Sequence, residues 1–151
     1  MSILKVDAGA TALFVVATVV GATLFGNWKF VAAVTSGALF VVGCGVFLAA
    51  YARAVQRSRT DAIGIGGLYF LAGATAPTTV KRSMNLLLAV QCIVGLAGAL
   101  ARPYSALAFG VLVPVFGLGM NGFWAARHGV FGSRTAALRP HERETVPDRT
   151  E

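Results

Sequence analysis

Four long runs without a charged side chain constrain the fold of this sequence more than any other feature. They cover residues 8–26, 30–52, 84–101 and 104–126, and none contains Asp, Glu, Lys, Arg or His. A helix needs about twenty apolar residues to cross the ~30 Å hydrocarbon core of a bilayer. We therefore expect an all-α, polytopic integral membrane protein whose four transmembrane helices form a bundle.

The composition agrees with a lipid environment. Of the 151 residues, 56% are hydrophobic and only 13% are charged, whereas about 25% are charged in a typical soluble domain. A cleaved signal peptide is the competing interpretation of the first run, because Lys5 provides a positive start. That run is longer than the apolar region of a signal peptide, which is usually about 7 to 15 residues. Only residues 27–29 separate it from the second run. The sequence favours a tight helical hairpin.

The basic residues are distributed unevenly between the two predicted sides. Lys29 and Arg102 fall on one side, and the other eleven fall on the opposite side: Lys5, Arg53, Arg57, Arg59, Lys81, Arg82, Arg127, Arg134, Arg139, Arg143 and Arg149. Since Lys and Arg in short loops remain cytoplasmic, we expect a multi-pass protein of the cell (inner) membrane with the N- and C-termini both in the cytoplasm.

This charge asymmetry indicates which partners the basic residues have. The net charge of +7 lies on the predicted cytoplasmic face, where anionic lipid headgroups attract each Lys or Arg by about 1 kcal/mol. Nucleic-acid binding is not needed to explain it. The candidate headgroup contacts are Arg53, Arg57, Arg59, Lys81 and Arg82; the alternative is that they are snorkelling anchors that fix the topology.

Residues 62–76 (AIGIGGLYFLAGATA) form a fifth uncharged segment between the basic clusters. As a helix the segment would extend about 22 Å, which is short of the ~30 Å core, and a fifth span would reverse the charge bias. We expect a re-entrant or interfacial segment on the cytoplasmic side, with Tyr69 at the headgroup boundary. A re-entrant segment must have its backbone polar groups satisfied by protein or water.

The predicted spans contain a few polar side chains and many small residues. Asn85, Gln91 and Asn121 are candidates for hydrogen bonds between helices, and Gln91 is the strongest; a substrate contact is the alternative for it. Small residues let membrane helices approach closely, and the candidate packing positions are Gly21, Gly37, Gly95, Gly117, Gly119 and Gly122. Residues 117–122 (GLGMNG) match a dinucleotide-binding fingerprint formally, but no strand precedes them. Pro114 is expected to bend the fourth helix.

We find no constellation that indicates catalysis. The sequence offers no paired carboxylates, no triad and no metal-ligand spacing, so we expect neither enzymatic activity nor a cofactor or metal. Asp7 and Asp61 look like isolated interfacial acids, and a Cys44–Cys92 disulfide would require facing helices. The length and span number resemble the small multidrug resistance transporters, whose membrane-embedded Glu in the first helix has no counterpart in the first run.

The chain divides into a transmembrane domain, residues 1–130, and a polar tail, residues 131–151, which we expect to be a disordered cytoplasmic segment. Four stretches, residues 52–61 (ARAVQRSRTD), 67–73 (GLYFLAG), 102–110 (RPYSALAFG) and 122–129 (GFWAARHG), together resemble uncharacterised small four-span membrane proteins of actinobacterial type. The resemblance supplies no activity.

The sequence leaves three functional hypotheses. The first is an accessory or scaffolding subunit that packs against other membrane proteins or associates with itself. The second is a small transporter or channel for a neutral or hydrophobic solute, with Gln91, Asn121 and residues 64–76 along its path. The third is a lipid-handling enzyme or regulator that binds a headgroup phosphate through Arg53, Arg57 and Arg59.

Overall fold

The computed structural model describes residues 2–24 and 28–133 of the chain. Its elements, in order, are α1 (Ile3–Thr23), α2 (Trp28–Arg57), β1 (Asp61–Ala62), α3 (Ile65–Phe70), α4 (Thr78–Ala101), the 3₁₀ helix η1 (Ala106–Leu112), α5 (Pro114–His128) and β2 (Gly132–Ser133). Four helical stretches are long and apolar enough to cross a membrane, namely α1, α2, α4 and Ala106–His128. The prediction of four such helices is confirmed.

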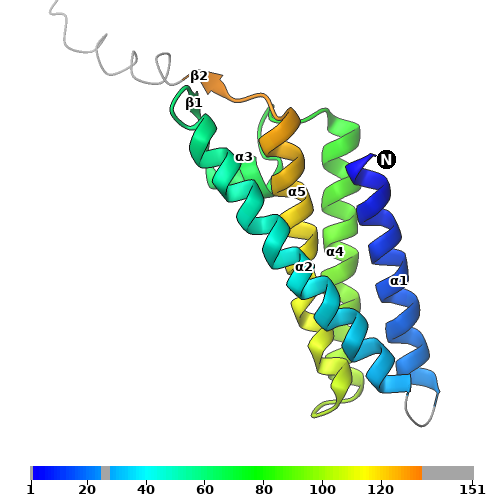
Figure 1. Cartoon of the computed structure of the whole chain (residues 1–151). Coiled ribbons are helices and arrows are strands. Elements are labelled where there is room, and N and C mark those ends of the chain that lie inside the picture. Colours follow the sequence, from blue (N-terminus) through cyan, green and yellow to red (C-terminus); the bar gives the residue numbers. More distant parts are fainter. Residues whose placement is uncertain (1, 25–27, 134–151) are drawn as a thin grey trace, which may run out of the picture.

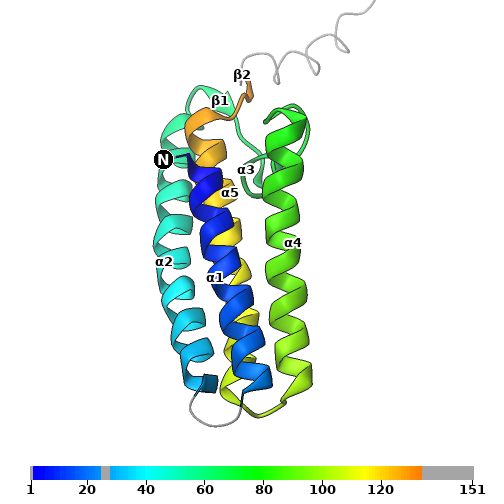
Figure 2. The ribbon, with the colours of Figure 1, turned by 90° about the vertical axis from the view of Figure 1, so that its right-hand side faces the viewer.

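The four long segments run alternately up and down as a bundle (Figures 1 and 2). The start of α1, the α2–α4 connection and β2 lie together at one end, and the end of α1, the start of α2 and the α4–η1 connection lie at the other (Figure 1). The first end, which we call the basic end, carries Lys5, Arg53, Arg57, Lys81 and Arg127 among other cations. The charge asymmetry of the sequence is therefore an asymmetry between the two ends of the fold.

The helices extend beyond the apolar runs that predicted them. α1 begins at Ile3 rather than residue 8, α2 continues to Arg57, and α4 begins at Thr78 rather than residue 84. A charged residue ends an apolar run without ending a helix, because the backbone hydrogen bonds continue inside the helix whatever the side chain. The runs therefore located the helix centres but not their ends.

The fourth segment is two helices of different geometry rather than one bent helix. Pro114 has no backbone N–H with which to continue an α-helix from Gly110. The amide of Val113 donates to the Gly110 carbonyl oxygen at 3.2 Å, and the amide of Phe116 donates to that of Val113 at 2.8 Å. The chain is consequently tightened into η1 before Pro114 and relaxes into α5 after it.

Close approach at glycine positions holds α2 against α5. A β-carbon at Gly43 would lie 2.6 Å from the Phe116 α-carbon, and one at Gly119 would lie 2.9 Å from the Gly43 carbonyl oxygen. A β-carbon at Gly95 of α4 would lie 2.5 Å from the Gly110 carbonyl oxygen of η1. Side chains at these positions would push the helices apart, so glycine permits the backbone contact that dispersion forces then stabilise.

The segment between β1 and α4 folds back into the basic end of the bundle. α3 lies against α5, with Leu68, Tyr69 and Leu71 buried, and Leu71 takes a left-handed conformation with φ 53° that reverses the chain. Tyr69 is only 6% exposed, so its ring is covered by protein; its place at the headgroup boundary stays a prediction. The ring is buried because α3 packs into the bundle instead of lying on its surface.

The first residues of the predicted tail are part of the fold. β2 pairs antiparallel with β1, with Asp61 opposite Ser133 and Ala62 opposite Gly132. The ring of Phe131 packs close to Gly67. The boundary between bundle and tail is therefore at least three residues later than residue 130, and the remainder of the predicted disordered tail, residues 134–151, lies outside the described residues.

Candidate functional site

A buried hydrogen-bond network joins α1, α4 and α5 around the side chain of Gln91. Its amide nitrogen donates to the hydroxyl of Thr11 at 2.7 Å and to the carboxyl oxygen Oδ1 of Asp7 at 3.3 Å. Its carbonyl oxygen accepts from the backbone N–H of Gly117 at 3.1 Å. Gln91 and Asp7 are completely buried. This side chain therefore bonds two other helices, as the sequence predicted for an interhelical contact.

Asp7 corrects two expectations from the sequence. It is not an isolated interfacial acid, because α1 starts before it and turns its side chain, together with that of Thr11, toward Gln91. The first helix therefore does contain a buried acidic residue, about one turn from its N-terminal end. Its second oxygen, Oδ2, has no hydrogen-bond partner. Buried acids inside membrane helices are costly and commonly functional.

Asn85 and Asn121 together secure the C-terminal end of α3. The Asn121 amide donates to the Tyr69 carbonyl oxygen at 3.0 Å and to Asn85 Oδ1 at 3.1 Å. The Asn85 amide in turn donates to the Phe70 carbonyl oxygen at 3.0 Å. The last carbonyl groups of a helix lack partners within it, and here two side chains supply them. Both asparagines lie seven residues inside their helices, about 10 Å from the basic end.

Arg57 is used inside the fold rather than left free at its surface. Its guanidinium forms a salt bridge with Asp61 at 2.8 Å and donates to the backbone carbonyl oxygens of Ala126 and Gly129. It also lies over the ring of Phe131. The expectation that Asp61 is an isolated acid is therefore wrong. Arg57 also connects the end of α2 to the end of α5.

The other candidate headgroup contacts remain accessible at the basic end. Arg53 and Arg59 are exposed, and the guanidinium of Arg53 lies over the ring of Phe123. Lys81 and Arg82 line a separate groove beside the start of α4, together with Gly73, Thr78 and Asn85.

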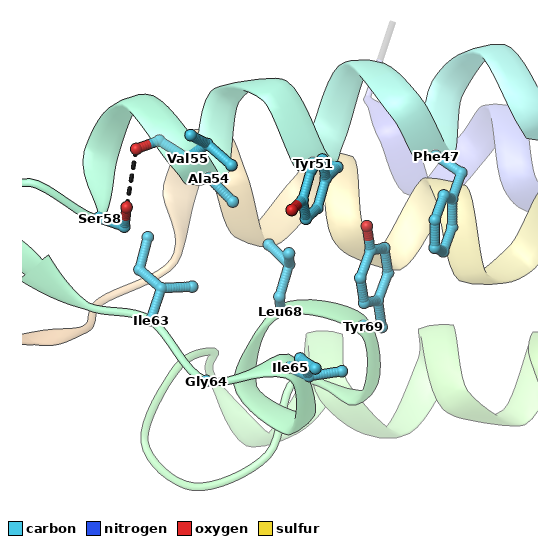
Figure 3. A pocket seen from close by; sticks show the side chains of 10 residues that line it. All are labelled: Phe47, Tyr51, Ala54, Val55, Ser58, Ile63, Gly64, Ile65, Leu68 and Tyr69. Carbon is cyan, nitrogen blue, oxygen red and sulfur yellow. Dashed lines mark hydrogen bonds between the residues drawn. The ribbon is translucent and has the colours of Figure 1, made fainter.

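A different cavity lies between α2 and α3 (Figure 3). Its walls include Phe47 and Tyr51 of α2 and Leu68 and Tyr69 of α3. Burial, and to a smaller extent the neighbouring Tyr51, raises the pKa of the Tyr69 phenol. That hydroxyl is therefore a neutral donor at physiological pH, and it has no hydrogen-bond partner. Sequence reasoning missed this cavity, because it forms only when α3 folds back onto α2.

The six glycines proposed for helix packing fall into two groups. At Gly21, Gly95, Gly117, Gly119 and Gly122 a β-carbon would lie 2.5–3.1 Å from a neighbouring atom, so all five sit in contacts within the chain. At Gly37 of α2 it would meet nothing within 4 Å, and the same is true at Gly45, about two turns further on. These two glycines therefore face away from the bundle.

The described residues contain no group of three or more His, Cys, Asp or Glu side chains that could hold a metal ion. Cys44 and Cys92 are both free thiols. Comparisons with protein-family models, curated proteins and solved structures found no match to this chain. The resemblance to actinobacterial membrane proteins therefore stays a prediction.

Proposed function

We propose that this chain is a non-enzymatic integral membrane protein that acts as an accessory subunit, with the outward face of α2 docked on a helix of another membrane protein. The observation that supports the proposal is a heptad pattern on that face. Val34, Val41, Leu48 and Val55 recur every seven residues and are all exposed. Small residues follow at three or four positions after the first three of them.

Glycine makes this face unusual for one that contacts only lipid. Large apolar side chains face lipid in any membrane helix, but an outward glycine costs about 1 kcal/mol of helix propensity relative to alanine. Gly37 and Gly45 provide no contact inside the bundle. Alternating large and small residues at a seven-residue spacing let a second helix pack closely in a left-handed crossing. A partner helix gives both glycines a use.

The orientation in the membrane is part of the same proposal. Lys81 and Arg82 beside the start of α4, and Arg53 and Arg59 near the end of α2, would face anionic headgroups on the cytoplasmic side of the cell membrane. Both termini would then lie in the cytoplasm. Labelling of intact cells with a membrane-impermeant thiol reagent tests this orientation. Cys introduced at Ser2 or at Ser133 is compared with Cys introduced at Tyr104.

Co-purification from native membranes in a mild detergent tests the subunit role. We expect a second membrane protein in a fixed ratio with the wild-type chain, and its loss in Gly37→Leu and Gly45→Leu variants. Gly9→Leu is the matched control, because Gly9 is also an outward glycine with nothing within 4 Å of its β-carbon. A monomer without a partner would refute the proposal, and a homodimer sensitive to the same variants would replace it with self-association.

Asp7 supports a second candidate, a small transporter coupled to proton movement. Its unpartnered oxygen Oδ2 is buried inside the bundle, and ion-coupled transporters use buried acids of this kind. Gln91 gives less support to a solute path, because it is completely buried and both ends of its amide are hydrogen-bonded. Asn121 is also completely buried and donates through its nitrogen, while its Oδ1 has no partner. Proteoliposomes loaded with the pH dye pyranine are given an acid pulse. Internal acidification that is faster than in protein-free vesicles with the same dye, and that is abolished by Asp7→Asn, would favour transport. No difference from empty vesicles would exclude this proton-coupled mechanism.

A further inference from the structure

The cavity between α2 and α3 has the size and the lining of a ligand site. It encloses about 360 Å³, and ligand pockets in proteins commonly measure about 300–1,000 Å³. The side chains around it come from both helices and from the strand-to-helix connection, and they point into a shared space (Figure 3). All of the lining residues are uncharged, and most are apolar, including Phe47, Tyr51, Val55, Ile63, Leu68 and Tyr69.

One polar group in this wall is left without a partner. The Tyr69 ring is stacked on Phe47, with centroids 4.4 Å apart and planes 9° apart, and the Tyr69 backbone is held by Asn121. The hydroxyl is therefore fixed in position, yet it has no hydrogen-bond partner in a residue that is only 6% exposed. Buried polar groups in folded proteins are almost always hydrogen-bonded. The described residues supply no acceptor for this donor, and a ligand in the cavity would supply one.

We propose that the cavity binds an ester-linked acyl chain of a membrane glycerolipid, with the ester carbonyl oxygen accepting the hydrogen bond of the Tyr69 hydroxyl. The apolar walls fit the hydrocarbon, and the phenol fits the one acceptor group close to it. Val55 ends the heptad of the docking face and also lines this cavity, but neither Gly37 nor Gly45 lines it. The cavity therefore does not depend on the accessory role.

The charges near the cavity select an ester over an ionised group. A carboxylate or phosphate in this cavity would be buried without a cation, which is costly. Arg57, at the same end of α2, is already bonded to Asp61 and to the carbonyl oxygens of Ala126 and Gly129. An uncharged carbonyl needs only a donor, and Tyr69 provides one.

Two lipids that differ only in the linkage of their chains test the proposal. The delipidated full-length chain in detergent is titrated with diphytanoyl phosphatidylcholine in its ester form and in its ether form, and bound lipid is counted by native mass spectrometry. The ether lipid lacks the carbonyl acceptor. We expect the ester form to bind about five-fold more tightly, as one neutral hydrogen bond allows. Equal binding of the two lipids to the wild-type chain would overturn the proposal.

Variants of the cavity locate the effect. Tyr69→Phe removes only an unpaired hydroxyl, so it should fold and lose the preference for the ester lipid. Tyr104→Phe is the matched control, since Tyr104 is fully exposed at the opposite end, and should keep the preference. Ile63→Trp, at a partly buried wall position outside the docking face, should fill the cavity and weaken binding of both lipids. If the Tyr69→Phe variant still prefers the ester lipid, the ester carbonyl is bound by another donor and the proposed site is refuted.

Discussion

The amide of Gln91 and the phenol of Tyr69 are both buried polar groups of this bundle, but their surroundings differ. Gln91 bonds Asp7, Thr11 and Gly117 on two other helices, whereas the Tyr69 hydroxyl bonds nothing and faces a cavity. A satisfied buried group stabilises the fold, while an unsatisfied one reduces stability and stays available to a ligand. Gln91 therefore holds the bundle together, whereas the Tyr69 hydroxyl makes no bond that stabilises it.

Removing the Gln91 side-chain amide should have the largest effect on stability. Gln91→Leu keeps the approximate volume but breaks three hydrogen bonds and leaves their partners buried and unpaired, so we expect a loss of about 2–3 kcal/mol in the free energy of unfolding. Equilibrium unfolding in mixed micelles measures it. Gln56→Leu, at an exposed position of α2, is the control and should change stability by less than ~0.5 kcal/mol. Equal losses in the free energy of unfolding for the two variants would show that the hydrogen bonds of Gln91 do not stabilise the bundle.

Releasing α3 should have the next largest effect. Asn121→Leu removes the hydrogen bonds to the Tyr69 carbonyl oxygen and to Asn85, and we expect a loss of about 1–2 kcal/mol in the free energy of unfolding. Hydrogen exchange of the backbone amides of α3 should accelerate more than that of α4. Uniform acceleration along the chain would mean that Asn121 supports the whole bundle rather than this segment.

The coupling between Asp7 and Gln91 should be smaller and measurable. When both partners of a buried hydrogen bond are replaced by apolar groups, neither is left unpaired. We therefore expect the double variant Asp7→Leu with Gln91→Leu to be about 1 kcal/mol more stable than the sum of the two single losses predicts. Additive losses in the same unfolding experiment would show that the 3.3 Å contact contributes no coupling.

The smallest effect should come from Tyr69→Phe. Its hydroxyl has no partner to lose, and the stack on Phe47 is kept, so the free energy of unfolding in lipid-free detergent should change by less than ~0.5 kcal/mol. A loss comparable to that of Gln91→Leu would contradict the comparison and indicate a bond within the chain. With ester lipid present, the wild type should gain stability over the variant, because ligand bound to the folded state stabilises it.

Local sequence patterns predicted those features that depend on one helix. The uncharged runs located the four long helices, since hydrocarbon-crossing length is a property of a single segment. Gln91 was recognised as a buried polar residue because it stands alone among apolar neighbours. The runs did not predict the helix ends, where charged residues continue a helix beyond its apolar centre, or the division of the fourth run into η1 and α5.

Features that depend on distant partners were missed. Asp7 was placed outside the first helix because an uncharged run has to start after it, and its burial requires Gln91, 84 residues away. The spacing of Asp7, Thr11, Phe14, Thr18 and Gly21, all buried on one face of α1, was the available signal. Tyr69 gave no such signal, because its environment depends on α3 folding back onto α2.

The position of Arg57 also has a consequence for how the protein is made. Its guanidinium bonds the Ala126 carbonyl oxygen, 69 residues later in the chain, and Gly43 meets Phe116 in the same pair of helices. At about 5–20 residues per second, a ribosome needs roughly 3–14 s between the two partners. During that interval α2 stays in the translocation machinery or the bilayer, and its Gly43 face is not covered by α5. A chaperone or insertase that shields this helix would shorten its exposure, and chains truncated before α5 should be degraded rather than retained.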